Sequence, residues 1–219
     1  MSIFKIKRIF LDKNYWFFRE VEFASQGINE YIDNSDKIIT SIKKSLGQYE
    51  SQLRNWPAHK VKRSFNVIEY YSKRFSHQLY YNSIFITEYS FLERKMLQIC
   101  KIAESKQRLK LKDITGKGIF KYYIYFEKVL KIDMSEVNSE WLQILKYNEL
   151  RNLLVHHPTY IIENDSPVKA KLKLLKSIKY LLIEEDDGAF EFQITDKRLL
   201  KEFNHTIVEF LAGIYYDNS

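Results

Sequence analysis

Residues 79–106 read LYYNSIFITEYSFLERKMLQICKIAESK, and this stretch decides the fold class of the chain. Its apolar side chains recur at steps of three or four residues, at Phe85, Tyr89, Leu92, Met96, Ile99 and Ala103. That spacing places them along one face of an α-helix. The segment therefore predicts a long amphipathic helix, and with it a mainly α-helical fold.

The composition of the whole chain favours the same fold class. The 219 residues are 45% hydrophobic and include only six Gly and three Pro. Few turn formers and long stretches without proline favour helices, and this length suffices for one full core or for one domain with a helical extension. Aromatic residues make up 16% of the chain. We expect them to build the core rather than a surface that stacks on bases.

Outside 79–106, further segments predict the remaining elements. Residues 14–46 predict one or two helices, with Asp33-Asn34-Ser35-Asp36 as a candidate break, and a helix follows Pro57 over about 58–76. Residues 119–129 predict another helix. The Asp187-Gly188 pair between 180–184 and 190–194 predicts a small β-hairpin. A last helix is expected from Thr195-Asp196 onward, with a core stripe at Leu199, Phe203, Ile207, Phe210 and Ile214.

Charge and cysteine content limit the cellular setting. The formal net charge of +7 suits a polyanionic partner such as RNA, but by itself supports one only weakly. The single cysteine, Cys100, excludes an internal disulfide, and its apolar neighbours predict a buried side chain in a protein of a reducing compartment. No stretch approaches the roughly 18 uncharged apolar residues of a membrane span, and charges interrupt the N-terminus too often for a signal peptide. We expect a cytoplasmic protein that does not enter a membrane.

A second amphipathic helix carries the most informative residues. Asn138-Ser139-Glu140 opens it, with Ser139 as the expected cap, and Pro158 disfavours helical geometry beyond it. One stripe along it changes from apolar to polar, through Trp141, Leu145, Asn148, Asn152 and His156. A helix with a purely structural role would stay apolar along its buried stripe. The change predicts a cleft or an interface near residues 148–156.

Arg151, Asn152 and His156 are side chains suited to phosphate chemistry that uses no metal. Arginine offers a planar, permanently charged fork for phosphate, and histidine suits proton transfer near neutral pH. Asn152 and His156 are four residues apart and share a face. Arg151 and His156 lie about 140° apart around the helix, with Asn152 between them. The three can border one pocket, but they do not stack on one another.

The segment 149–156, ELRNLLVH, resembles the signature of the HEPN superfamily, in which Arg, often followed by Asn, precedes His by four to six residues. Ser90–Leu97, SFLERKML, is similar to the earlier long helix of many members. The resemblance spans residues 79–214, and it implies a HEPN-like helical bundle with a small C-terminal β-hairpin. Residues 1–78 match no family that we recognise, and we expect them to form an N-terminal helical extension.

The resemblance implies a metal-independent endoribonuclease that cleaves RNA by attack of the ribose 2′-hydroxyl. In that reading His156 transfers protons, Arg151 stabilises the phosphate, and Asn152 orients the phosphate or the imidazole. Since one chain offers one clear catalytic histidine, we expect a homodimer with a composite site at its two-fold axis. The habits of the family imply a toxin or a phage-defence protein of a bacterium, with an antitoxin or another defence-system protein as a possible partner.

Several further residues are secondary candidates. His157 ranks behind His156 because it lies about 100° further round the helix and next to a proline. Glu93 either pairs with Arg151 across the bundle or lies on an exposed flank. A lysine-rich segment offers contacts for the RNA backbone or forms a solvated helix face, and its residues are Lys169, Lys171, Lys173, Lys176 and Lys179.

The sequence also argues against a metal site, a cofactor site and a modified tyrosine. Its five histidines lack any metal-ligand spacing and no glycine-rich phosphate loop occurs, so we expect neither a metal nor a cofactor. Some HEPN proteins carry a modified tyrosine two residues after the histidine. Here Pro158 occupies that position and the nearest tyrosine is Tyr160, which argues against that regulation. Two alternatives remain: a non-catalytic HEPN-like module that binds a nucleotide or a protein, and a purely structural helical dimer.

Overall fold

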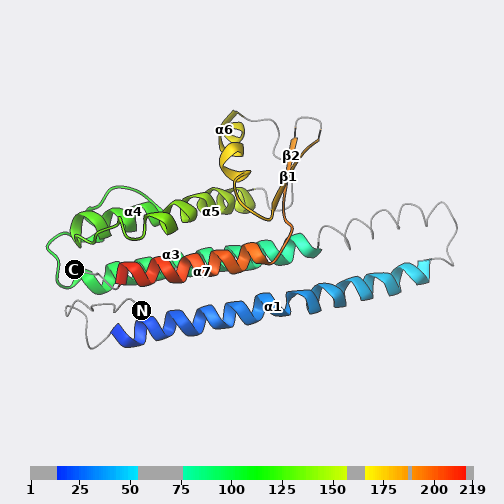
Figure 1. Cartoon of the computed structure of the whole chain (residues 1–219), viewed down its shortest axis with the longest axis horizontal. Coiled ribbons are helices and arrows are strands. Elements are labelled where there is room, and N and C mark those ends of the chain that lie inside the picture. The colour runs from blue at the N-terminus through cyan, green and yellow to red at the C-terminus, as the bar shows by residue number, and fades with distance from the viewer. Residues whose placement is uncertain (1–13, 54–75, 157–165, 187–188, 216–219) are drawn as a thin grey trace. The chain divides into compact units, whose positions relative to one another are not determined.

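The computed structural model describes residues 14–53, 76–156, 166–186 and 189–215, and most of them are helical. The long helices are α1 (Asn14–Leu53), α3 (Ser76–Glu104), α5 (Asn138–His156) and α7 (Arg198–Tyr215). Shorter helices are α4 (Gly118–Ile124), which continues into a π-helical turn at Tyr125–Val129, and α6 (Ser166–Leu175). Strands β1 (Leu181–Asp186) and β2 (Ala189–Ile194) form one antiparallel pair (Figure 1). The predicted mainly α fold with a C-terminal hairpin is confirmed.

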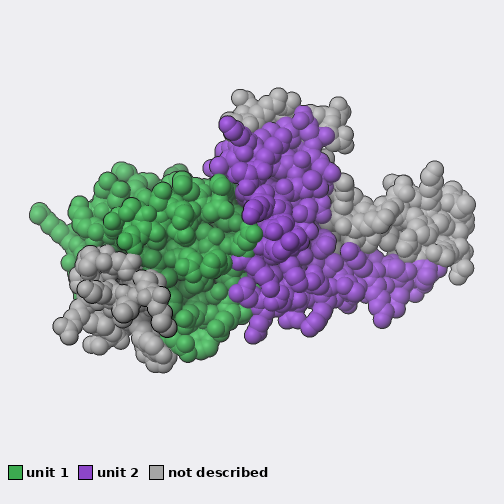
Figure 2. All heavy atoms as spheres, viewed as in Figure 1, with its two compact units in different colours: residues 1–28, 87–148, 202–219 green, residues 29–86, 149–201 purple. Residues whose placement is uncertain are grey.

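The chain divides into two compact units, each built from segments that are distant in the sequence (Figure 2). Unit 1 comprises residues 1–28, 87–148 and 202–219, and unit 2 comprises 29–86 and 149–201. Each of the four long helices contributes residues to both units. The predicted domain boundary after residue 78 marks the point at which the resemblance to a known family begins. It stays a prediction.

The core of unit 1 is made of aromatic and aliphatic side chains from α1, α3, α5 and α7. The rings of Tyr123, Trp141 and Phe210 form a stack, with centroid distances of 4.3 and 5.6 Å between neighbours. Asn204 of α7 donates a hydrogen bond to the Ser25 carbonyl of α1. The buried apolar residues of the last helix in this unit are Phe203, Ile207, Phe210, Leu211 and Ile214. Together with Leu199 in unit 2 they confirm the predicted stripe and the predicted use of aromatics in the core.

The core of unit 2 packs the hairpin against helices. The strands pair from Leu181↔Ile194 to Asp186↔Ala189, which confirms the predicted hairpin. The Gln78 amide of α3 donates a 2.7 Å hydrogen bond to the Phe192 carbonyl, so a buried backbone acceptor is satisfied by a side chain. The buried apolar residues of this unit are Ile32, Ile39, Tyr81, Ile84, Phe85, Leu150, Leu153, Leu154, Leu175, Ile178, Phe190, Phe192, Ile194, Leu199 and Leu200.

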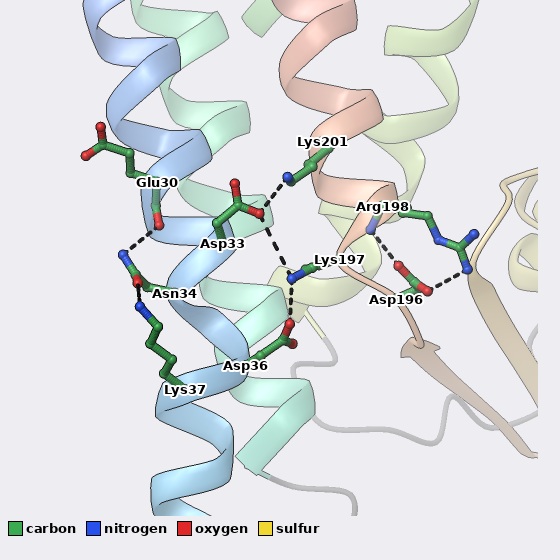
Figure 3. Close-up of polar contacts among 9 residues, drawn as sticks. All are labelled: Glu30, Asp33, Asn34, Asp36, Lys37, Asp196, Lys197, Arg198 and Lys201. Atoms are coloured by element: carbon green, nitrogen blue, oxygen red, sulfur yellow. Dashed lines mark hydrogen bonds and ion pairs between the residues drawn. The ribbon is translucent and has the colours of Figure 1, made fainter.

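Helix α1 continues through Asp33-Asn34-Ser35-Asp36, so the structure selects one helix of the two arrangements that the sequence left open. Each polar residue of the cluster is accommodated without a break. Asn34 donates to the Glu30 carbonyl one turn earlier, and Ser35 faces the core. Asp33 and Asp36 form ion pairs with Lys201 and Lys197 in the same unit (Figure 3). The Lys201 ammonium, which hydrogen-bonds to Asp33, lowers the pKa of that carboxyl.

Most of the other predicted elements are present in the structure. The helices predicted over 79–106 and 119–129 are confirmed, as are the start at Asn138 and the end before Pro158 of the motif helix. The role of Ser139 as cap is wrong, because Ser139 lies inside the helix and its hydroxyl donates to the Glu140 carboxylate. The helix expected over 58–76 lies almost entirely outside the described residues. Within the described ranges, no helix combines the length and the hydropathy that a bilayer crossing requires.

Candidate functional site

The last two turns of α5 carry Arg151, Asn152 and His156, all in unit 2. Leu150, Leu153 and Leu154 are buried and hold this end of the helix against the core of the unit. Arg151 and Asn152 are half-buried. The helix thus fixes the backbone of the motif while leaving its polar groups accessible.

Arg151 and Asn152 are directly linked. Arg151 Nη1 donates a 3.2 Å hydrogen bond to Asn152 Oδ1. This contact restricts the guanidinium, a planar group whose donors suit phosphate oxygens. Asn152 therefore positions Arg151, in addition to its expected role of orienting the phosphate or the imidazole.

His156 is exposed in the last turn of α5. No described residue forms a hydrogen bond with its ring, so the structure shows no neighbour that would fix the tautomer. The described part of α5 ends at His156. His157 lies outside the described residues.

The lysines of α6 belong to the same unit as the motif. Lys171 Nζ lies 2.5 Å from Glu149 Oε2, an ion pair that ties α6 to the motif turn of α5. Its charge is therefore partly neutralised, which makes it a weaker RNA contact than expected. Lys173 and Lys176 are exposed. Lys169 lies in α6, but its side chain is not among those described.

Asn148, by contrast, is a core residue of unit 1. It is buried, and its Oδ1 accepts a 2.5 Å hydrogen bond from the Tyr89 hydroxyl of α3. The neighbouring Tyr147 packs against Phe203 with a centroid distance of 4.5 Å, and burial raises the pKa of its hydroxyl. The change from apolar to polar at Asn148 thus reflects a satisfied buried pair. Asn148 therefore does not belong to the cleft expected over 148–156, and a cleft at Arg151–His156 stays a prediction.

Glu93 lies in unit 1 beside α4. A Cβ atom added at Gly118 would lie 3.2 Å from Glu93 Oε1, and the negative charge of Glu93 contributes to the raised pKa of Tyr122 after burial, the main cause. Gly118 has φ 54°, a conformation that suits glycine. The pairing of Glu93 with Arg151 stays a prediction.

Sequence reasoning missed one titratable residue, Glu88 of α3. Its side chain is fully buried in unit 1, and neither carboxylate oxygen has a hydrogen-bond partner among the described residues. Burial raises the pKa of this carboxyl well above the ordinary value. The signal was present in the sequence, because Ile84, Glu88, Leu92 and Met96 follow one another at steps of four.

Cys100 is buried, as predicted, and burial raises the pKa of its thiol to about 12. Among the residues that the structure describes, no group of three or more His, Cys, Asp or Glu is placed to hold a metal ion.

No family model matches this sequence, and no curated protein or solved structure is significantly similar to it. The HEPN resemblance therefore rests on the residues of this chain alone.

Proposed function

We propose that this chain is a metal-independent endoribonuclease of HEPN type, acting in the cytoplasm as a homodimer. The observation that carries the proposal is the geometry at the end of α5. A half-buried guanidinium is restrained by Asn152, and an exposed imidazole lies in the next turn of the same helix. The exposed Lys173 and Lys176, in the same unit, add positive charge suited to an RNA backbone.

The proposed reaction needs three contributions, and these residues are suited to provide them. The ribose 2′-hydroxyl attacks the adjacent phosphorus, a base accepts its proton, and the 5′-oxygen leaves as it receives a proton. His156 transfers protons, a contribution of about 10²- to 10⁴-fold for a well-placed group. Arg151 stabilises the charge on the pentavalent phosphate, and Asn152 holds the guanidinium in place. The products are a 2′,3′-cyclic phosphate and a 5′-hydroxyl.

A second copy of the chain would complete the site. One imidazole serves poorly as base and acid in a single displacement, and Arg151 and His156 diverge by about 140° around the helix. A two-fold axis near the end of α5 would bring two copies of each residue to one cleft. We also propose a toxin or phage-defence role, with an antitoxin or another defence-system protein as partner, on the resemblance alone.

Cleavage of mixed RNAs in EDTA tests the proposal. Wild type is expected to cleave, and Arg151→Ala and His156→Ala are each expected to lose about 10²-fold or more. His205→Ala is the matched control, because His205 is also an exposed helical histidine but lies on α7 in unit 1. Equal cleavage by all four proteins would indicate a contaminating nuclease and reject the proposal.

The second candidate is a non-catalytic module that binds a nucleotide or a protein through the same end of α5. It is favoured by the His156 ring, which no described residue orients, whereas an active base is usually held by a third group. RNA binding that Arg151→Ala weakens, without any cleavage by wild type, would select this candidate.

A further inference from the structure

Unit 1 contains an open hollow between α1 and α3, with a volume of about 440 Å³. Pockets that bind small molecules start at about 300 Å³, and this hollow is of comparable volume but open to solvent. Its lining combines charged, amide and aliphatic side chains: Glu20, Arg94, Leu97, Gln98, Lys101 and Ile102.

The hollow is positively charged. Arg94 and Lys101 are exposed and seven residues apart, so both lie on one face of α3, about 10 Å from each other along the axis. Lys95 adjoins them with its ammonium group almost fully buried, 5.0 Å from the Phe17 ring and 5.7 Å from the Phe91 ring. Glu20 carries the one negative charge among the residues that line the hollow.

Glu20 partners the buried ammonium group. Its Oε1 lies 2.9 Å from Lys95 Nζ, and Gln98 accepts a 3.2 Å hydrogen bond from the same nitrogen. The Glu20 side chain is 54% exposed, so it can rotate into solvent without disturbing the core. The hydrogen bond from Lys95 lowers the pKa of Glu20, which keeps this carboxylate charged. A buried cation with a removable anionic partner is a place that another anion can occupy.

We propose that this hollow binds a phosphate group, which displaces Glu20 from Lys95 and is held from either side by Arg94 and Lys101. Arginine and lysine are the usual side chains for phosphate, arginine as a planar fork and lysine as a point charge. Leu97 and Ile102 offer apolar contact to the ribose or base attached to the phosphate. The site lies in unit 1, is separate from the motif of α5, and does not depend on ribonuclease activity.

Titration calorimetry on the full-length chain without magnesium tests the site. The probes are ATP, a single-stranded oligoadenylate RNA whose 2′-hydroxyls are methylated so that the proposed ribonuclease cannot cleave it and, as the uncharged comparison, adenosine. We expect the phosphorylated probes to bind and adenosine not to bind. The double variant Arg94→Gln/Lys101→Gln should weaken binding about tenfold or more, since each change removes a charged hydrogen bond. Glu20→Gln should strengthen it severalfold, because the competing charge is gone.

Two controls separate this site from the motif and from general charge effects. Lys112→Gln removes an exposed positive charge elsewhere in unit 1 and should leave affinity unchanged. The cleavage assay in EDTA is the second control. It tests the motif of α5, whereas ATP binding tests this site, so failure of the ribonuclease proposal and failure of this one are distinguishable. ATP binding with the expected variant pattern supports a free nucleotide as the source of the phosphate, and RNA binding alone with that pattern supports the RNA backbone.

Three outcomes would overturn the proposal. Neither phosphorylated probe binds, or adenosine binds as tightly as ATP. The third outcome is that Arg94→Gln/Lys101→Gln loses no more affinity than Lys112→Gln does. Both glutamine changes of the double variant lie on the surface, so circular dichroism is expected to show an intact fold.

Discussion

Glu88 is the residue whose environment departs most from what its chemistry prefers. Neither carboxylate oxygen has a hydrogen-bond partner among the described residues, and burial raises the pKa of this carboxyl well above the ordinary value because ionisation in a core is costly. The charges of Glu202 and Glu88 contribute, after burial, to the raised pKa of Tyr147 in the same unit. The stability of the folded chain must therefore depend on the protonation of Glu88.

The sign of that dependence follows from the direction of the shift. The pKa of Glu88 is raised above the ordinary 4.5, so between these two values the folded state binds more protons than the unfolded state. Stability is unaffected below about pH 4.5 and falls as pH rises above it, by at most about 1.4 kcal/mol per pH unit for one proton. Urea denaturation at a series of pH values should show this slope in wild type and its loss in Glu88→Gln.

Glu30→Gln is the matched control for that series, because Glu30 is an exposed glutamate on α1. It should reproduce the wild-type slope. A slope that is the same in Glu88→Gln and in wild type would show that this carboxyl is not buried in its neutral form.

The Tyr89–Asn148 pair gives a second prediction for single residues. Tyr89→Phe removes the donor and leaves the buried Asn148 Oδ1 without its 2.5 Å hydrogen bond. We expect a loss of about 1–3 kcal/mol in the free energy of unfolding. The loss should be smaller when Asn148→Leu is already present, because no acceptor then remains. Additive losses in the double variant would contradict the pairing.

The residues of the site could be predicted only in part. Arg151, Asn152 and His156 lie on α5 as the spacing required, but the link from Arg151 to Asn152 depends on rotamers that a sequence pattern does not specify. Asn148 shows the opposite case. A polar residue on an apolar stripe indicates either a site or a satisfied core partner, and only the position of Tyr89 decides between them.

At the scale of elements, Gly213 of α7 leaves the least room for a side chain among the glycines that the structure describes. A Cβ atom added there would lie 2.1 Å from Val137 Cγ1, closer than carbon atoms can pack. Gly213→Ala should therefore destabilise the chain by about 1 kcal/mol or more, because overpacking exceeds the gain in helix propensity. Thermal or urea unfolding measures the change.

Gly27 in α1 is the matched control, since an added Cβ would meet nothing within 4 Å. Gly27→Ala should stabilise the chain by about 0.5–1 kcal/mol, the ordinary advantage of alanine over glycine in a helix. Val137→Ala should relieve Gly213→Ala by removing the opposing methyl groups. Destabilisation by both glycine changes would contradict the packing difference.

Periodicity predicted the helices and the hairpin well because both signals are local. The stripe of α7 and the Asp-Gly turn signal need no knowledge of distant residues. The cluster Asp33–Asp36 was ambiguous for the opposite reason. Turn-forming side chains continue a helix when partners such as Lys197 and Lys201 are present, and those partners lie more than 160 residues away.

For the whole molecule, the proposed homodimer gives a prediction that a single chain could not give. If one cleft holds both copies of His156, one as base and one as acid, a dimer of one wild-type chain and one His156→Ala chain lacks one of the two groups. Co-expression with two different tags isolates that mixed dimer. It should keep far less than half of the wild-type cleavage, whereas two independent sites would keep about half.

A mixed dimer that keeps half of the wild-type cleavage would reject the composite site, while light scattering on the same sample establishes that a dimer was present. The sequence did not predict the division into two interleaved units. It arises from contacts between segments far apart in the chain, for which local patterns carry no signal.

The order of synthesis gives the interleaving a biological consequence. Unit 1 needs α7, and α7 leaves the ribosome after every other described element. A nascent chain that already displays Arg151 and His156 therefore still lacks Phe203, Ile207 and Phe210 from the core of unit 1. Translation that stops before α7 would release a product without that core, and also without Leu199 and Leu200 from the core of unit 2.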